Sequence, residues 1–348
     1  MLAVLALFAA GCHKEKEDYS GPEDLGKMGT ANCYVVTKPG TFKFNAVKGN
    51  SSEPISAVTA EVLWETWNNA ETVTPGSVIA SAALQNGYVV FSTPESLRPG
   101  NAVIAARDAA GEIAWSWHIW VPAIGIFVDH YGIYGAAMMD RNLGALVPAT
   151  IATPAPVESF GLTYQWGRKD PFVGPERINT SKNATVAGTA HSTAQGDETR
   201  ISLAKSILQP VLLGHAKNGD WVLPSDPNLW QDGKKTMYDP CPPGYRVPAC
   251  DKTQYLHSPD LSLAPGWTDE AAKYWFALGN PRAVFPLAGY RDDYAPDGLT
   301  HAYDRALVWT ATSSSDEKAY YVNVRTGSAH ALSEAPKSRG GSVRCVAE

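Results

Sequence analysis

The stretch DPCPPGYRVP, residues 239–248, places four prolines and one glycine within ten positions. Because proline lacks a backbone N–H and fixes φ, such a stretch fits neither a helix interior nor a central strand. The sequence therefore predicts a rigid, irregular loop at this point. Its Cys241 is available for bonding to a second thiol, and Cys345 stands three residues from the end of the chain.

The number and spacing of the five cysteines set the options for cross-linking. With Cys12 set apart as a lipidation site, four cysteines remain, and four allow three disulfide connectivities. We favour a Cys241–Cys345 bond, which would tie the proline-rich loop to the last strand and leave Cys33 and Cys250 free and buried. No CxxC or Cys/His spacing occurs, so a zinc site is not predicted.

The first twelve residues resemble a bacterial lipoprotein signal. Their ten apolar residues are too few to cross a bilayer and are typical of a signal peptide. They run into Ala-Ala-Gly-Cys at positions 9–12, which resembles a lipobox, and several acyl chains on Cys12 would anchor the protein stably. The alternative is a cleaved signal peptide followed by an incidental cysteine. Residues 13–30 are polar and are interpreted as a tether.

Residues 31–122 carry the pattern of a β-sandwich. The dipeptide NG at positions 86–87 separates two β-prone runs and favours a type I′ hairpin turn. In residues 112–121 apolar and polar side chains alternate, so that Trp115 lies on one face and His118 on the other. Because no partner motif accompanies it, His118 is interpreted as a core or interface histidine. About seven such strands in ninety residues predict an immunoglobulin-like sandwich.

Residues 122–125 are interpreted as a linker, and residues 126–348 as a second domain of the α+β class. Apolar residues at helical spacing predict short helices at 199–213 and 269–278. Short strands are expected around them, at residues 126–134, 162–167, 284–287, 306–310, 320–325 and 342–346.

Six phrases of this second region resemble the major paralogous domain family called FISUMP, and they occur in that family's order. They are MMDRNLGA (138–145), YQWGRKDPF (164–172), KTMYDPCPPGYRVP (235–248), FPLAGYR (285–291), WTATSSS (309–315) and GGSVRCV (340–346). The resemblance implies the compact C-type-lectin-like or formylglycine-generating-enzyme-like fold, preceded by a sandwich module. It also implies a Bacteroidetes outer-membrane lipoprotein displayed at the cell surface, to which the charged run HKEKED at 13–18 is suited, with links to fimbriae in some members.

The chain also departs from the proteins that share this fold. The calcium-dependent sugar triplets of true C-type lectins are absent, and so is the reactive cysteine arrangement of formylglycine-generating enzymes. No arginine precedes Arg98, so the cleavage that matures stalk pilins is not predicted. The chain is expected in a pilus only as an accessory or tip subunit.

The polar triplet Asp140, Arg141 and Asn142 is the first candidate ligand-binding site, because it interrupts an apolar stretch. The alternative is an internal ion pair with turn caps, which we favour because a buried carboxylate needs a partner.

A second candidate site groups aromatic, hydroxyl and charged residues near the ends of the C-terminal strands. Aromatic rings beside hydroxyls suit a sugar; against this, Trp309 would serve equally well as a core anchor. The ligand-binding candidates here are Tyr290, Arg291, Asp292, Trp309 and Ser313.

Clustered carboxylates in the same region suit a hard cation, and calcium is the ion that they would bind. The alternative is a solvated acidic loop. The candidate metal ligands are Asp292, Asp293 and Asp297.

The composition and motifs favour a binding protein over an enzyme. The net charge of −6 and the scattered basic residues argue against a nucleic-acid partner. No nucleophile elbow, HExxH, P-loop or dinucleotide fingerprint occurs. We expect a non-catalytic surface lipoprotein, without a cofactor, whose sandwich presents a head that binds a glycan or a host or bacterial surface protein. The alternatives are a fimbrial accessory subunit that exchanges strands with other subunits and an enzyme of the formylglycine-generating type.

Overall fold

A computed structural model describes residues 21–130, 137–149, 156–178, 180–196, 199–252, 275–277, 284–294, 296–302, 304–325 and 328–348. The predicted signal peptide and lipobox with Cys12, and the tether up to residue 20, lie outside the described residues. No helix in the described ranges has the length and apolar character needed to cross a bilayer.

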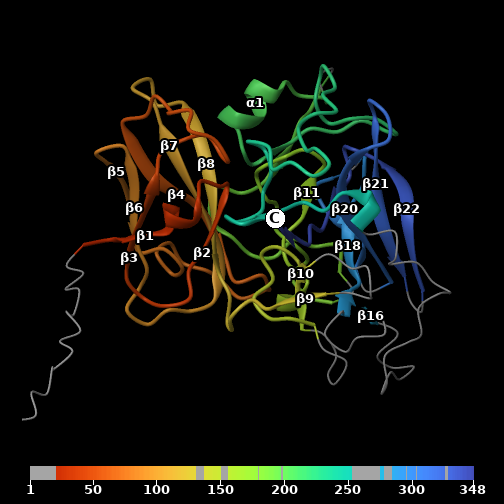
Figure 1. Cartoon of the computed structure of the whole chain (residues 1–348), viewed down its shortest axis with the longest axis horizontal. Helices are drawn as coiled ribbons and strands as arrows, with labels where there is room; N and C mark the ends of the chain where they lie inside the picture. Colours follow the sequence, from red (N-terminus) through yellow and green to blue (C-terminus); the bar gives the residue numbers. More distant parts are fainter. Residues whose placement is uncertain are drawn as a thin grey trace, which may run out of the picture.

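Two sheets form the N-terminal region and face each other across a shared core (Figure 1). The first is ordered β1 (Glu23–Asp24), β3 (Thr41–Asn45), β6 (Tyr88–Ser92), β5 (Ser81–Gln85). The second is ordered β12 (Ala187–Gly188), β4 (Thr59–Thr66), β7 (Gly100–Arg107), β8 (Ile113–Val121), β2 (Cys33–Val35). Two facing sheets are therefore present over residues 23–121, and β12 adds a strand from further along the chain.

The local sequence signals within this sandwich are confirmed. Asn86 and Gly87 have φ of 51° and 80°, which a type I′ turn requires, and Gln85 pairs with Tyr88 across the hairpin β5–β6. The alternation in β8 is also real, because Trp115 and Trp117 belong to the sandwich core while Trp120 points to the other side.

The C-terminal region is built mainly from strands. Its largest sheet is ordered β11 (Tyr164–Gln165), β23 (Gly340–Gly341), β18 (Ala288–Arg291), β20 (Arg305–Ser313), β21 (Lys318–Arg325), β22 (Ser328–Pro336), with β19 (Leu299–Ala302) beside β18. A four-stranded sheet is ordered β15 (Tyr245–Arg246), β24 (Val346–Ala347), β10 (Ala137–Met139), β9 (Val128–His130). Two further pairs are β13 (Ser192–Thr193) with β14 (Leu212–Leu213), and β16 (Trp275–Ala277) with β17 (Val284–Pro286).

The predicted helices are largely wrong, so within the described ranges the chain is mainly β and not α+β. Of the helix expected at 199–213, only α1 (Leu203–Leu208) is present. Ser202 caps α1 by accepting a hydrogen bond from the Lys205 N–H at 3.1 Å. It ends before Pro210, which cannot continue a helix. Of the second, residues 269–274 and 278 lie outside the described ranges, and Trp275–Ala277 form a strand instead. The remaining helical segments are single 3₁₀ turns, η1 (Leu25–Met28), η2 (Val157–Ser159) and η3 (Cys250–Lys252).

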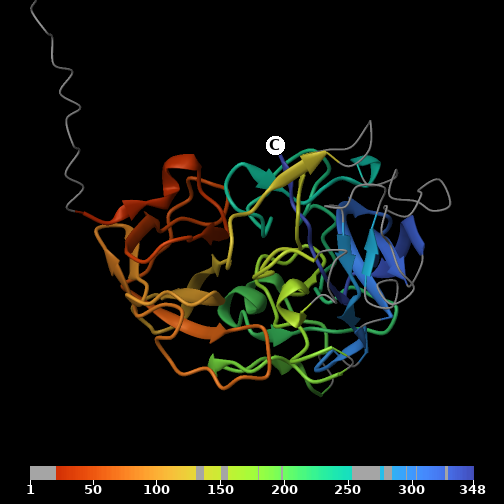
Figure 2. The ribbon, with the colours of Figure 1, turned by 90° about the horizontal axis from the view of Figure 1, so that it is seen from below.

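The two regions share one hydrophobic core. The outer face of the second sandwich sheet contributes Leu63, Trp64, Val103 and Trp120 to the cluster that also holds Trp166, Trp221, Trp230 and Trp309 of the C-terminal region. Figure 2 shows the green segments packed between the sandwich and the blue strands. In addition, β12 pairs antiparallel with β4, so the C-terminal region covers that edge of the sandwich. The sandwich is therefore not a separate stalk.

Buried polar side chains line the junction between the sandwich and the C-terminal region. Asn101 donates to Asn68 Oδ1 at 3.0 Å and to the Gly144 carbonyl at 2.8 Å, while its own Oδ1 lies 2.8 Å from His118 Nε2. Because both Asn101 amide hydrogens are used, His118 must donate, which fixes its neutral tautomer. Burial lowers the pKa of His118 to about 3. His118 therefore lies at the junction of the two regions, in agreement with its interpretation as a core or interface histidine.

Candidate functional site

The predicted triplet Asp140–Asn142 is buried. The Arg141 side chain is fully covered and lies 2.8 Å from Asp140 Oδ1 through Nε. Its terminal nitrogens donate to the carbonyls of Ile124 at 3.2 Å and Gly125 at 2.8 Å. The ion pair therefore fastens the predicted linker to the C-terminal region. The internal ion pair favoured in the sequence analysis is therefore present, and Asp140 and Arg141 are buried in the interior.

Asn142 is engaged in the same interior. Its amide nitrogen donates to the Phe160 carbonyl at 3.1 Å, and its Oδ1 accepts from Arg344 Nε at 3.2 Å. Arg344 in turn donates to the Val284 carbonyl at 2.9 Å. Asn142 thus joins two distant segments of the chain and is buried in the interior.

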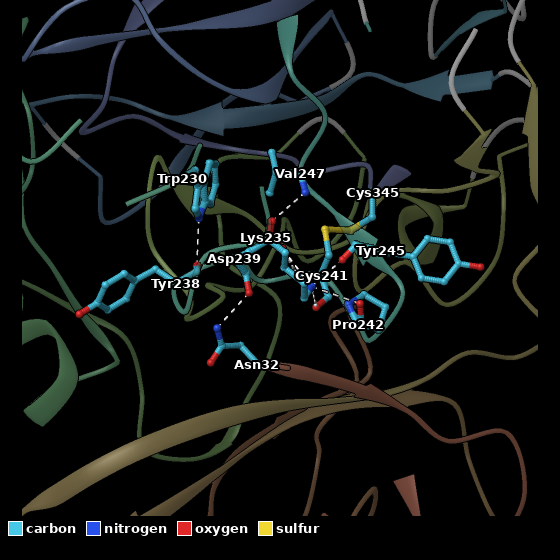
Figure 3. The surroundings of a disulfide bond; sticks show 10 residues. All are labelled: Asn32, Trp230, Lys235, Tyr238, Asp239, Cys241, Pro242, Tyr245, Val247 and Cys345. Carbon is cyan, nitrogen blue, oxygen red and sulfur yellow. Dashed lines mark hydrogen bonds and ion pairs between the residues drawn. A yellow bond between two sulfur atoms is a disulfide. The ribbon is translucent and has the colours of Figure 1, made fainter. Parts of the chain in front are cut away.

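The proline-rich loop forms the predicted disulfide between Cys241 and Cys345, shown in Figure 3. Asp239 organises the loop by accepting from the N–H groups of Cys241 at 2.8 Å and Val247 at 2.9 Å. Lys235 donates to the carbonyls of Cys241 at 2.7 Å and Tyr245 at 2.5 Å. The side chains of Lys235 and Asp239 therefore stabilise the loop itself.

The other two cysteines carry no disulfide. Cys33 is buried, as expected, whereas Cys250 is partly exposed and so differs from the prediction. Burial raises the pKa of the Cys33 thiol far above its usual value, which makes it unreactive.

Two further candidates belong to the core of the large sheet. Arg291 is fully buried and donates to the carbonyls of Val173 at 2.6 Å and Pro296 at 2.9 Å. Trp309 is fully buried and donates from Nε1 to the Tyr164 carbonyl at 2.9 Å. Trp309 therefore occupies the core position that was its alternative reading, and the polar groups of both residues are used inside the fold.

Ser313 lies at the end of β20 and its hydroxyl donates to the Ser315 carbonyl at 2.7 Å. It stabilises the turn between β20 and β21 and is not among the residues lining the cavities described below.

A polar groove of about 650 Å³ lies beside β19. Asp292 and Asp297, both predicted from the sequence, line it together with Tyr294, whose side chain is 58% exposed. The other lining residues are Ser181, Lys182, Asn183, Gly298, Leu299 and Thr300. We call this the polar groove. It offers carboxylate, hydroxyl and amide groups next to an exposed aromatic ring.

Two carboxylates at the edge of the polar groove already have partners within the fold. Asp293 accepts from the Asn218 N–H at 2.6 Å and from Arg339 Nε at 3.1 Å, and Asp292 lies 3.8 Å from Arg339. Burial opposes charge on Asp293, but the Asp292 side chain, the Asn218 N–H and Arg339 outweigh it and lower its pKa. Across the described ranges, no three His, Cys, Asp or Glu side chains gather closely enough to hold a metal. The proposed calcium set of Asp292, Asp293 and Asp297 is therefore not assembled.

A second, smaller cavity of about 240 Å³ is lined in part by Tyr290. Three arginines line it, Arg305, Arg325 and Arg339, together with Tyr290, Ala306, Leu307, Tyr321 and Asn323. We call this the arginine cleft. Burial raises the pKa of both tyrosines, although the arginines oppose the shift, so both phenols are neutral at pH 7. Of its residues only Tyr290 was predicted.

The arginines were missed because sequence spacing does not bring them together. Arg305 begins β20 and Arg325 ends β21, so the antiparallel pairing places them directly opposite each other. The pair could have been found by predicting two antiparallel strands on either side of the polar turn at 314–317 and matching their residues across the hairpin. Arg339 comes from the turn before β23 and has no such signal.

Comparisons with known proteins give no match: no family model fits the chain, and none of the curated proteins or solved structures is similar to it.

Proposed function

We propose that this chain is a non-catalytic, lipid-anchored surface protein of the FISUMP type that binds a glycan through the polar groove. The observation that carries the proposal is the groove itself, where the exposed ring of Tyr294 stands among the oxygen and nitrogen groups of Asn183, Asp297 and Thr300. An aromatic face covers the apolar side of a sugar, while carboxylate, amide and hydroxyl groups bind its hydroxyls.

The expected location is consistent with two observations. A disulfide is favoured in oxidising compartments, and Cys241–Cys345 is such a bond. The sheet containing β18 and β21 lies at the end of the molecule opposite to β1 (Figure 1). An anchor at Cys12, before β1, would attach the protein at the end opposite to that sheet.

The finer fold assignment is also part of the proposal. The first sheet, ordered β1-β3-β6-β5, has the strand order A-B-E-D of immunoglobulin-like sandwiches. In the second sheet, β4-β7-β8 has the order C-F-G, and β2 is an added strand. The C-terminal region, with its short strands and long loops, is compatible with a lectin-like fold.

Glycan-array binding by the full chain tests the function. We expect binding that Tyr294→Ala lowers at least tenfold, because the ring would supply the stacking surface. Tyr88→Ala, on the sandwich, is the matched control and should leave binding unchanged. Silence of the wild-type chain across neutral and acidic glycans would refute the proposal.

A fimbrial accessory role is a second candidate, favoured by strand β5. It forms the outer edge of its sheet among the described strands, and its side chains are partly or fully exposed. Such an edge can accept a strand from a neighbouring subunit, whereas the β4 edge is already paired with β12. Co-purification of the chain with sheared pili would support this role, and its absence from pilus preparations would contradict it.

A further inference from the structure

We propose that the arginine cleft binds the acid group of an acidic sugar, a residue that carries a carboxylate or a sulfate. This inference rests on the proposed glycan-binding function and narrows its ligand class. It does not follow from the polar groove, whose lining contains Asp292 and Asp297 and only one cation, Lys182.

The first argument is the repulsion built into the cleft. Arg305 and Arg325 stand directly opposite each other on neighbouring antiparallel strands. Like charges in directly opposed positions destabilise a sheet, and a bound anion between them would convert the repulsion into attraction. The arrangement is unexpected on a chain whose net charge is −6.

The second argument is that neighbouring carboxylates do not use up the guanidinium groups. Asp304 lies 3.4 Å from Arg305 Nε, and its oxygens are shared with His301 Nδ1 at 3.0 and 3.2 Å. Arg325 Nε donates to Asn323 Oδ1 at 3.3 Å. Among the residues that the structure describes, no hydrogen bond uses the terminal nitrogens of Arg305 or Arg325. Guanidinium forks of this kind hold a carboxylate or sulfate through two parallel bonds.

Arg339 is held in place at the cleft by other contacts. Asp293 fixes its Nε at 3.1 Å, and its guanidinium lies 5.2 Å from the ring centre of Tyr290. Tyr290 is itself stacked on His301, with ring centres 5.5 Å apart. A cation that is oriented before binding loses less entropy when it meets its ligand.

The size of the cleft sets the size of the group. Its 240 Å³ is smaller than the roughly 300 Å³ at which pockets for whole small molecules begin. It therefore takes one charged residue of a saccharide, with Asn323 and the phenols of Tyr290 and Tyr321 available to its hydroxyls. Arg339 of the cleft and Asp292 of the polar groove lie 3.8 Å apart, so neighbouring sugars can occupy the groove.

Isothermal titration calorimetry on the full chain tests this inference. The probes are trigalacturonic acid, sialyllactose and sulfated lactose, with methyl-esterified trigalacturonate and lactose as neutral counterparts. We expect an acidic probe to bind at least tenfold more tightly than its neutral counterpart. Arg305→Gln and Arg325→Gln should each weaken that binding at least tenfold, without lowering the melting temperature, because each substitution removes the opposed charge.

The control is Arg98→Gln, which changes the net charge equally but lies on the sandwich, where Arg98 pairs with Glu71 at 2.7 Å. The Arg98→Gln variant should bind the acidic probe as tightly as the wild type does. A preference among the acidic probes distinguishes a carboxylate ligand from a sulfate ligand.

Two results would overturn the inference while leaving glycan binding intact. One is equal affinity for an acidic probe and its neutral counterpart. The other is array binding that the substitutions of Arg305 and Arg325 do not change. Absence of binding to every glycan overturns both this inference and the proposed function.

Discussion

Removal of the Cys241–Cys345 disulfide should lower the free energy of unfolding by several kcal/mol. The bond closes a loop of 104 residues, and closing a loop of that length removes about 4.7 kcal/mol of chain entropy from the unfolded state at 25 °C. In the folded state, Tyr245 and Arg246 of β15 still pair with β24, next to Cys345, so the native geometry does not need the bond to hold the two segments together. The loss is therefore expected to come mainly from the unfolded chain.

The measurement is urea unfolding of the wild type and of the double variant Cys241→Ala/Cys345→Ala, followed by tryptophan fluorescence. Alanine is chosen because both cysteines are fully buried, where a serine hydroxyl would lack a partner. Reductant should destabilise the wild type and leave the double variant unchanged. A difference below about 1 kcal/mol, outside the usual range of 2–4 kcal/mol for a disulfide, would refute the reasoning.

Three further predictions concern the anchor and two buried titratable groups. Cys12→Ala should release the protein from membranes on cell fractionation, and unchanged retention would remove the anchoring proposal. Because burial lowers the pKa of His118 from 6.5 to about 3, its stabilising contribution is complete above pH 6.5 and is lost as the pH falls towards 3. The loss of stability should amount to about 2 kcal/mol at pH 5, and His118→Gln should reduce the difference between urea midpoints at pH 7.5 and pH 5. Burial raises the pKa of Asp220 from 3.8 to about 7, so this group costs stability as the pH rises from 3.8 through 7. Asp220→Asn should therefore raise the free energy of unfolding at pH 8 by at most about 4 kcal/mol, and the melting temperature with it. At pH 4 it should change both little. Equal effects at both pH values would contradict this.

Features whose causes lie within a few residues could be predicted from the sequence. The turn at Asn86 and Gly87 follows from the backbone freedom of its own residues, and the proline-rich loop follows from missing N–H groups. The disulfide could be favoured because few partners were available to Cys241. The turn and the loop needed no knowledge of distant contacts, whereas the disulfide joins residues 104 positions apart.

The candidate site depended on distant contacts and was predicted only in part. Arg291 and Trp309 were candidate binding groups, with a core role as the alternative for Trp309, and carbonyls more than a hundred residues away accept their hydrogen bonds in the interior. Asp292 and Asp297 do line a groove, because their loop is exposed. The helix expected at 269–278 fails at Trp275, where pairing with β17 overrides the local periodicity.

The shared core has a practical consequence for protein engineering. An expression fragment that starts at residue 126 would lose β4 as the partner of β12 and would leave Trp166 and Trp221 without part of their packing against Trp64 and Trp120. Such a product would be prone to insoluble aggregation, because large apolar surfaces and an unpaired strand edge would face the solvent. Expression fragments and chimaeras should accordingly keep the whole of residues 21–348 as a single unit.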